Sequence, residues 1–286
     1  MGNFAHEKCG RRSFPVALAV WLVCGIAVGD DDTRGIAATE PIPIAGGNLV
    51  VCWKTPDADS VLLHFHGAVE TVRQAYRASR FEGVLVVVNF PGLSRAYSTP
   101  VANNPELFDW VLNRAWENSR SVTENAGPAE WDQVNLSCFS AGYGAVREIL
   151  KTGSNFKRID ALITADSIYA GLDPESEARA VKPEHMRDFL RFARSAADEK
   201  KRFTLSHSSQ PTPYASTTET ADYLRSALGI ERESSSELIR PGMEQQTRAA
   251  DGRFLILGFA GTSGKAHMQH LHNIDLLWDL CLFDEQ

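Results

Sequence analysis

The sequence predicts an α/β protein in which helices cover both faces of a mostly parallel central sheet. Short apolar runs rich in β-branched residues alternate along the chain with longer segments whose apolar residues recur at helical spacing. Residues 84–90 are one continuous apolar run, as expected of an interior parallel strand. The chain has 286 residues, of which 43% are hydrophobic and 23% charged. This length and composition suit one large soluble domain of the α/β class.

The first 29 residues have the layout of a secretion signal. Basic residues precede an apolar run over residues 14–28, which ends in small residues. The run is short for a membrane span, and three aspartates follow it closely. We expect cleavage near Gly29, which predicts a secreted or periplasmic protein with no stable membrane span after cleavage. An uncleaved amphipathic anchor is the alternative.

The remainder of the chain is predicted to be a short leader and one domain. Residues 30–47 are expected to be disordered or extended, and residues 48–286 to form the α/β domain. Within this domain, residues 171–200 contain acidic residues followed by a helical pattern of apolar residues. We expect this segment to lie over the sheet, either as a lid or as a plain crossover helix.

Charge and cysteine usage exclude several classes of partner and site. The formal net charge of −7 argues against a nucleic-acid partner. Cys52, Cys138 and Cys281 lie outside the predicted signal, each in apolar surroundings. Their odd number and their spacing predict buried thiols, with neither a disulfide framework nor a zinc site of the CxxC type.

The domain begins with two predicted strands, residues 48–53 and 61–65, on either side of a turn at Pro56. A helix over residues 70–79 then leads to the apolar strand at 84–90. Each of these elements has a length and a pattern typical of its type.

The loop that follows this strand carries Arg95 and Tyr97. Sheets of this type bind their ligands at the edge where the carboxyl ends of the strands lie, so we expect both residues to contact the substrate. The apolar residues between 107 and 115 then recur at helical spacing and predict an amphipathic helix that covers the sheet.

Residues 134–150 are predicted to pass from a strand through a sharp turn into a helix, with Ser140 at the corner. The turn consists of small residues. A serine at such a corner has its hydroxyl pushed clear of the backbone, next to the first amides of the following helix. Ser140 is therefore the candidate nucleophile.

Asp166 comes directly after the next predicted strand, residues 161–165, and could face the site from its carboxyl end. The strand at 202–206 is followed by His-Ser-Ser-Gln, which contains no carboxylate. A polar segment, residues 231–252, then connects to the last predicted strand at 254–259.

Three histidines follow the last strand. A glycine-rich loop ends at His267, and His270 and His272 come shortly afterwards. The buried face of the terminal helix is predicted to begin at Leu271, so we expect His267 to precede that face on the loop.

The motif Cys138-Phe139-Ser140-Ala141-Gly142 resembles the nucleophile elbow G-x-S-x-G of the α/β-hydrolase superfamily, with Cys138 in place of the first glycine. The His66-Gly67 pair at the end of a strand resembles the oxyanion loop of the same superfamily. No narrower family is identified. By this resemblance the chain has the α/β-hydrolase fold, and the backbone amides of Ala68 and Ala141 form the oxyanion hole.

The resemblance also implies a catalytic triad in the order serine, acid, histidine. The acid of this superfamily more often follows the next strand, where no carboxylate is present, so Asp166 is the candidate acid. His267 is the candidate base because it follows the last strand, and His270 is the second candidate. The resemblance covers nearly the whole predicted mature chain, but its specific residues are few.

These residues predict a secreted serine hydrolase that cleaves a carboxylic ester of a small molecule or polysaccharide and needs no cofactor or metal. Peptidase, lactonase or acyltransferase chemistry would use the same residues. A catalytically inactive binding protein is an alternative, supported by Cys138 and by the missing carboxylate in the usual position. A metal-dependent hydrolase built on His267, His270 and His272 is a third reading, although no carboxylate lies near them in the sequence.

Overall fold

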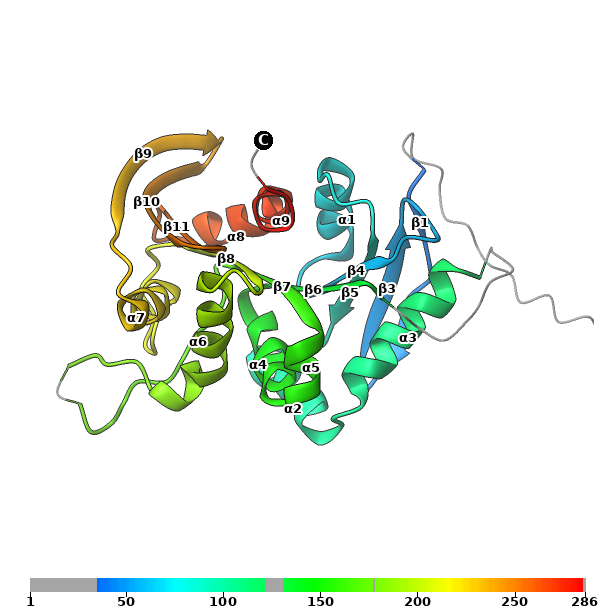
Figure 1. Ribbon diagram of the computed structural model, residues 1–286, viewed down its shortest axis with the longest axis horizontal. Coiled ribbons are helices and arrows are strands. Elements are labelled where there is room, and N and C mark those ends of the chain that lie inside the picture. The colour runs from blue at the N-terminus through cyan, green and yellow to red at the C-terminus, as the bar shows by residue number, and fades with distance from the viewer. Residues whose placement is uncertain (1–34, 122–130, 177, 285–286) are drawn as a thin grey trace, which may run out of the picture.

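An 11-stranded sheet runs through the part of the chain that the computed structural model describes, residues 35–121, 131–176 and 178–284 (Figure 1). The strands follow one another across the sheet in the order β1 (Ala37–Ala38), β3 (Gly47–Trp53), β5 (Val84–Asn89), β4 (Ser60–Phe65), β6 (Gln133–Phe139), β7 (Ile159–Ala165), β8 (Arg202–His207), β11 (Phe254–Phe259), β10 (Met243–Asp251) and β9 (Glu233–Arg240). Strand β2 (Ile42–Ile44) pairs with β3 beside this path.

The central strands, from β5 through β4, β6, β7 and β8 to β11, all run parallel. Strand β3 flanks them antiparallel on one side, and β10 followed by β9 flanks them antiparallel on the other. The carboxyl ends of all the parallel strands therefore lie along one edge of the sheet, where a binding site is expected.

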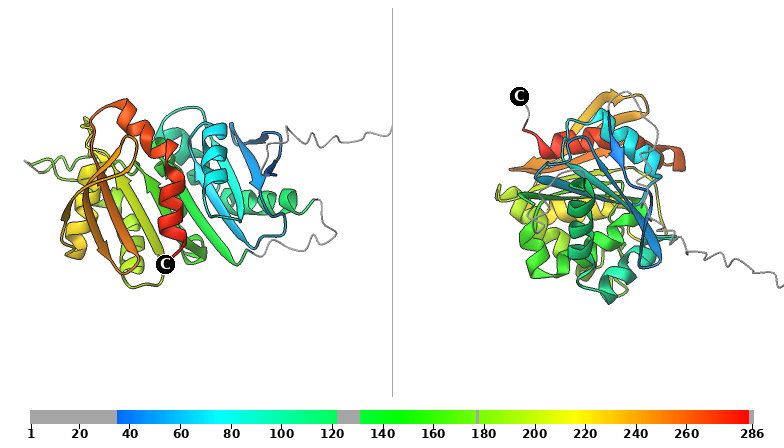
Figure 2. Two further views of the ribbon diagram at one scale, coloured as in Figure 1. Left: turned by 90° about the horizontal axis from the view of Figure 1, so that it is seen from above. Right: turned by 90° about the vertical axis from the view of Figure 1, so that its right-hand side faces the viewer.

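Helices cover both faces of the sheet, as Figure 2 shows from two further directions. One face carries α1 (Val69–Ala78), α8 (Gly264–His272) and α9 (Ile274–Leu282). The other carries α2 (Ser94–Asn103), α3 (Leu107–Ser119), α4 (Tyr143–Lys151), α5 (Gly153–Arg158), α6 (Pro183–Ala197) and α7 (Thr217–Leu228). The predicted fold class, a mostly parallel sheet with helices on both faces, is confirmed.

Successive side chains of the central strands enter two different cores. In β4 and β5, Leu62 and Val87 pack on the side of α1 and α9, whereas Leu63 and Val86 pack on the side of α3 and α4. All four side chains are fully buried. Burial on both faces explains why these strands are continuous apolar runs and why the sequence predicted them well.

The structure differs from the sequence prediction beyond residue 230. The polar segment at 231–252 contains a hairpin, β9 and β10, that extends the sheet beyond β11. Met243 and Ala249 of β10 are buried, but most other side chains of the hairpin are exposed or half-buried. An edge hairpin of this kind is held mainly by main-chain pairing, so its composition is polar and gives little strand pattern.

The leader and the predicted insertion have simple forms where they are described. Residues 37–38 and 42–44 are short strands, β1 and β2, that pair with β3. In the insertion, α6 packs with Met186 and Phe189 fully buried, as a crossover helix does, and residues 171–176 and 178–182 lie in the connection before it. No helix among the described residues is long and apolar enough to cross a membrane. The predicted signal, residues 1–29, lies outside the described residues.

Two glycines bring the turn after β6 close to its neighbours. A Cβ atom on Gly142 would lie 2.1 Å from the carbonyl oxygen of Phe65 at the end of β4. A Cβ atom on Gly144 would lie 2.2 Å from the carbonyl oxygen of Ser94, where α2 begins. Because only glycine permits these approaches, Ser140 is held between the end of β4 and the start of α2.

Candidate active site

Ser140 stands at a sharp turn between β6 and α4. Strand β6 ends in the extended residue Phe139, and Ser140 opens the short 3-10 helix η1 (Ser140–Gly142) with φ of +46°. Few residues other than glycine adopt this left-handed conformation, and a nucleophile elbow is one place where it occurs. The turn leaves Ser140 half-buried and lining a cavity.

Cys138, which departs from the elbow pattern, is accommodated without disturbing the turn. Its side chain is fully buried, and its Sγ lies 3.3 Å from the hydroxyl of Ser167. The same hydroxyl donates a hydrogen bond of 2.7 Å to the carbonyl oxygen of Ser140. Burial raises the pKa of Cys138 to about 12, so this thiol stays protonated at neutral pH. Cys138 thus supports the elbow through Ser167.

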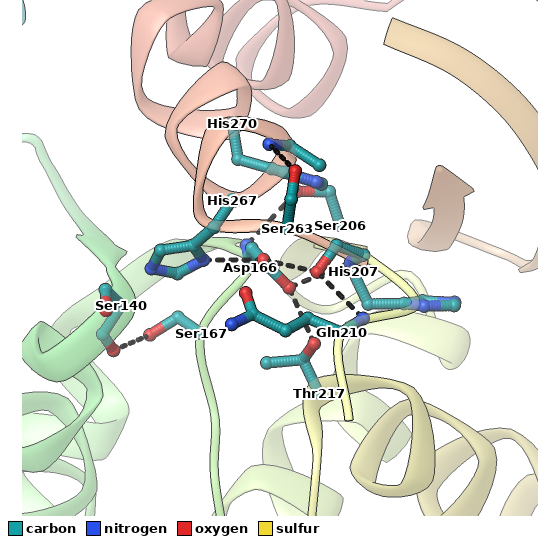
Figure 3. A network of polar contacts seen from close by, with 12 residues as sticks. Ser140, Asp166, Ser167, Ser206, His207, Gln210, Thr217, Ser263, His267 and His270 are labelled. Carbon is teal, nitrogen blue, oxygen red and sulfur yellow. Dashed lines mark hydrogen bonds and ion pairs between the residues drawn. The ribbon is translucent and has the colours of Figure 1, made fainter. Parts of the chain in front are cut away.

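Asp166 lies immediately after β7 and its side chain is completely buried. Its Oδ1 accepts hydrogen bonds from the amide of Ser208 (2.8 Å) and the hydroxyl of Thr217 (2.6 Å). Its Oδ2 accepts from the hydroxyl of Ser208 (2.7 Å) and from Nδ1 of His267 (2.6 Å) (Figure 3). All the polar groups around the carboxylate therefore donate to it.

These donors keep Asp166 ionised. Burial alone would raise the pKa of its carboxyl group. The hydrogen bonds from His267, Thr217 and Ser208 outweigh burial and hold the pKa well below its usual range. Because an ionised carboxylate can only accept, Nδ1 of His267 must carry the hydrogen of their shared bond.

Ser208 and Thr217 are the residues of this network that the sequence did not reveal. Ser208 follows β8, the position where the resemblance placed the usual acid, and it donates twice to Asp166 instead of replacing it. Thr217 opens α7 directly after Ser216, whose hydroxyl caps the helix by accepting from the amide of Glu219 at 3.3 Å. Only the fold could show that Thr217 turns toward Asp166.

His267 lies in the first turn of α8, so the expectation that it precedes the helix on a loop is wrong. Ser263 caps this helix, and the amide of His267 donates to the carbonyl of Ser263 at 3.0 Å. The helix therefore begins earlier than predicted. The prediction relied on the spacing of apolar residues, which does not take into account the capping oxygen of Ser263. The first turn of α8 still carries His267 to the carboxyl edge of the sheet.

The imidazole of His267 is fixed between Asp166 and the elbow. Its ring stacks on Phe139, the residue before Ser140, with the ring centroids 4.5 Å apart. Nδ1 is bound to Asp166, and in Figure 3 the other ring nitrogen is turned toward Ser140. Both Ser140 and His267 line one cavity. In the described residues no hydrogen bond joins their side chains; such bonds are often long before a substrate is bound.

The other histidines near the site are engaged elsewhere. His270 is buried with its Nδ1 at 2.8 Å from the hydroxyl of Ser206, and burial lowers its pKa to about 4. His64 lies between the hydroxyl of Ser137 (2.9 Å) and the carbonyl of His66 (3.0 Å), and burial lowers its pKa to about 3. Both are neutral side chains satisfied locally.

The two predicted oxyanion donors lie on neighbouring segments. Ala141 is part of η1, directly after Ser140, and lines the cavity. Ala68 caps the start of α1 and is exposed, but it is not among the residues that line the cavity. The backbone of Gly67, the residue before Ala68, is held by the side chain of Asn89. Asn89 accepts a hydrogen bond from the Gly67 amide (3.1 Å) and donates one to the Gly67 carbonyl (2.8 Å).

Arg95 and Tyr97 do not contact the cavity, which corrects the sequence prediction. Both lie on helix α2 and not on a loop. The Tyr97 side chain is 1% exposed, and its hydroxyl lies 2.7 Å from Nδ1 of His66, while Arg95 is exposed outside the cavity lining. Burial of the aromatic ring is more favourable than its exposure to water, so the Tyr97 side chain points inward. Its contact with His66 supports the loop at that residue.

The cavity over Ser140 has a volume of about 470 Å³ and opens to solvent. Its walls come from α2, the elbow and α4, the loop after β7, α6, the loop after β8 and α8. The lining residues are Leu93, Ser94, Ser140, Ala141, Tyr143, Arg147, Tyr169, Ala170, Gly171, His185, Gln210, Thr212, Tyr214 and His267. Within the described ranges, no group of three or more His, Cys, Asp or Glu side chains is arranged to hold a metal ion.

No family model and no curated protein matches this sequence. Solved structures resemble it distantly. A zinc-bound, cold-adapted esterase from an Arctic intertidal metagenomic library has a TM-score of 0.49 at 12% identity, over 89% of this chain and 97% of that one. A serine hydrolase from Cycloclasticus zankles has a TM-score of 0.45 at 10% identity, over 88% and 100% of the two chains. A Pyrococcus furiosus esterase has a TM-score of 0.43 at 11% identity, over 85% and 93%.

The Asp166 network predicts a pH-dependent effect of Ser208→Ala. The folded pKa of Asp166 is below the unfolded value of about 3.9, so its contribution to stability is complete above that value and is lost as the pH falls through the folded pKa. Loss of the hydroxyl should lower the free energy of unfolding by about 1–3 kcal/mol at neutral pH. This loss should shrink only at pH values low enough to protonate the carboxylate in the folded protein, well below the unfolded value.

Urea unfolding at pH 7 and at successively lower pH, down to the acid limit of the folded state, measures this difference. Ser209→Ala is the matched control, because Ser209 is the next residue and is exposed. An equal loss for Ser208→Ala at a pH where the folded carboxylate is protonated would show that the hydroxyl does not act through the Asp166 charge.

Proposed function

We propose that the protein is a serine hydrolase that cleaves a carboxylic ester through a covalent acyl-enzyme. The observation that carries the proposal is the buried, ionised Asp166 bound to His267, whose ring stacks against the residue that precedes Ser140. An imidazole held by a carboxylate in one cavity with a serine at a left-handed turn is suited to nucleophilic catalysis.

The proposed reaction has two halves. His267 accepts the proton of the Ser140 hydroxyl as its oxygen bonds to the acyl carbon of the ester. The tetrahedral intermediate expels the alcohol, which takes the proton from His267, and leaves the acyl group on Ser140. Water then attacks this acyl group with His267 again as the base, which releases the acid and restores the serine. Asp166 orients the imidazole and stabilises its charged form.

The negative charge on the intermediate requires hydrogen-bond donors. In the proposal, the amides of Ala141 and Ala68 provide them, the first from the start of η1 and the second from the start of α1. The Asn89 side chain binds both the amide and the carbonyl of Gly67. The Gly67 carbonyl and the Ala68 amide form one peptide group, so these bonds support a rigid position for the Ala68 amide. Preorganised donors of this kind need no rearrangement as the charge develops.

The alternative of an inactive binding protein had two supports in the sequence. The first, Cys138 in place of glycine, is weakened because its side chain is buried against Ser167 and leaves the elbow intact. The second, the missing carboxylate after β8, is weakened because Asp166 reaches His267 from the adjacent strand. Both observations favour an enzyme.

Ser140→Ala should remove esterase activity and leave the fold intact. We expect the rate of p-nitrophenyl butyrate hydrolysis to fall by roughly a thousand-fold or more, because the nucleophile is lost. A fluorophosphonate probe should form an adduct on Ser140 of the wild-type protein, located by mass spectrometry, and none on the variant. Ser209→Ala, which removes an exposed hydroxyl, is the control. A wild-type protein that forms no adduct at any pH would favour the binding protein.

His267→Gln and His270→Gln should separate the two candidate bases. His267→Gln removes the proton acceptor, so kcat should fall by about a thousand-fold or more with little change in circular dichroism. His270→Gln disturbs a buried contact with Ser206, so it should lower the melting temperature and change kcat by less than about ten-fold. The reverse pattern of kcat values would assign the base to His270.

We also propose that residues 1–29 direct export and are removed, so that the hydrolase acts outside the cytoplasm on a small-molecule or polysaccharide-linked ester. The layout of basic, apolar and small residues supports this location. Expression of the full chain in a bacterial host should give a periplasmic or secreted product whose intact mass places its first residue near residue 30. A full-length product that stays in the membrane fraction would indicate the uncleaved anchor.

A further inference from the structure

The cavity over Ser140 is cationic although the protein is acidic. The chain has a formal net charge of −7. The described residues that line the cavity nevertheless include Arg147 and two histidines and contain neither aspartate nor glutamate. Asp166 is buried behind His267 and does not line the cavity. A ligand in the cavity therefore meets one permanent positive charge and no negative side chain.

Arg147 lies on α4, which begins at Tyr143, three residues after Ser140. Helical side chains lean toward the amino end of their helix, which here is the end that carries Ser140. The Arg147 guanidinium accordingly lies over the ring of Tyr143, 5.5 Å from its centre, one turn closer to Ser140. Arg147 thus faces the space between itself and the nucleophile.

The guanidinium of Arg147 is free to bind a ligand. Its nearest carboxylate belongs to Glu148, with 3.9 Å between Nε and Oε1. Glu148 is already bound by Lys151, whose ammonium lies 2.6 and 2.7 Å from the two carboxylate oxygens. Across the described residues, the Arg147 guanidinium donates no hydrogen bond, and its side chain is 20% exposed. A guanidinium presents paired donors that match the two oxygens of a carboxylate.

The remaining wall between Ser140 and the opening is aromatic and carries neutral donors. Tyr143, Tyr169 and Tyr214 form a row, with ring centres 5.8 Å and then 5.5 Å apart. His185 accepts a hydrogen bond from the amide of Gly171 through Nδ1 (2.9 Å), so in its neutral form Nε2 carries the hydrogen. Burial and then Arg147 and Lys182 lower the pKa of His185, which favours this neutral form.

We propose that the ester cleaved at Ser140 carries a carboxylate several bonds from the scissile carbonyl, and that Arg147 binds this carboxylate. The part of the substrate between the two groups packs along the tyrosine row. This inference rests on the proposed hydrolase function and specifies the substrate class. It explains why a cavity in an acidic protein is lined by an arginine with only one distant carboxylate partner and is free of side-chain carboxylates.

Two esters of similar length test the role of Arg147. Mono-p-nitrophenyl adipate carries a carboxylate at the end of a six-carbon acyl chain, and p-nitrophenyl hexanoate has the same chain without the charge. We expect Arg147→Gln to lower the ratio of kcat/KM for adipate to kcat/KM for hexanoate by about 10- to 100-fold, the usual effect of losing a hydrogen-bonded charge. Arg147→Lys should recover part of the ratio, because it keeps the charge and loses the paired donors.

Lys157→Gln is the matched control. It removes an exposed positive charge on the neighbouring helix α5, outside the cavity lining and away from Glu148. The ratio should not change in this variant. An equal fall for Lys157→Gln would mean that the general field of the protein, and not contact with Arg147, favours the anionic ester, and this result would overturn the inference. So would an unchanged ratio in Arg147→Gln.

A binding measurement separates failure of this inference from failure of the proposed function. Titration calorimetry of the Ser140→Ala protein with monomethyl adipate requires no turnover. Binding that is lost in the Ser140→Ala, Arg147→Gln double variant supports the anion site even if no ester is hydrolysed. Absence of binding, or binding that does not depend on Arg147, contradicts the anion site even if neutral esters are cleaved at Ser140.

Discussion

The carboxylate of Asp166 is the group on which the arrangement of the site depends. An ion removed from water is costly unless its oxygens receive hydrogen bonds. Asp166 receives four, from the segment after β8, the start of α7 and the first turn of α8. These donors lie 42 to 101 residues after Asp166 in the sequence, so the charge can be buried only when their segments reach it. The interaction that orients His267 therefore also ties the carboxyl edge of the sheet to two helices on opposite faces.

Burial of this charge separates the two electrostatic tasks that we propose for the site. Asp166 stands behind His267, where it can stabilise a charged imidazole without meeting the contents of the cavity. Arg147 stands on the cavity wall about one turn into α4, away from the proposed proton transfer. If the two charges shared the cavity they would pair with each other, and neither would be available for its task. The intervening tyrosines and the elbow keep them apart.

The sequence predicted the parts of the site that depend on strand order. Ser140, Asp166 and His267 each follow a strand of the parallel sheet, and parallel strands bring such positions to one edge. The sequence prediction failed where the role of a residue depends on the direction of its side chain. Tyr97 was expected to meet the substrate but points inward to His66, and nothing in the sequence indicates that the hydroxyl of Thr217 turns to Asp166. The β9–β10 hairpin was missed because its pairing is made by the main chain.

In the elbow, glycine is required only where a larger residue would collide with a neighbouring segment. At Gly142 and Gly144 a Cβ atom would come within 2.1 and 2.2 Å of carbonyl oxygens of other segments, which no side chain can relieve. At the first position of the motif, Cys138 lies in β6 and its side chain has room beside Ser167. The approach of β4 and α2 to the turn therefore depends on the later glycines, and a small buried residue suffices at the first. A departure from the pattern at Cys138 is compatible with a working elbow for this reason.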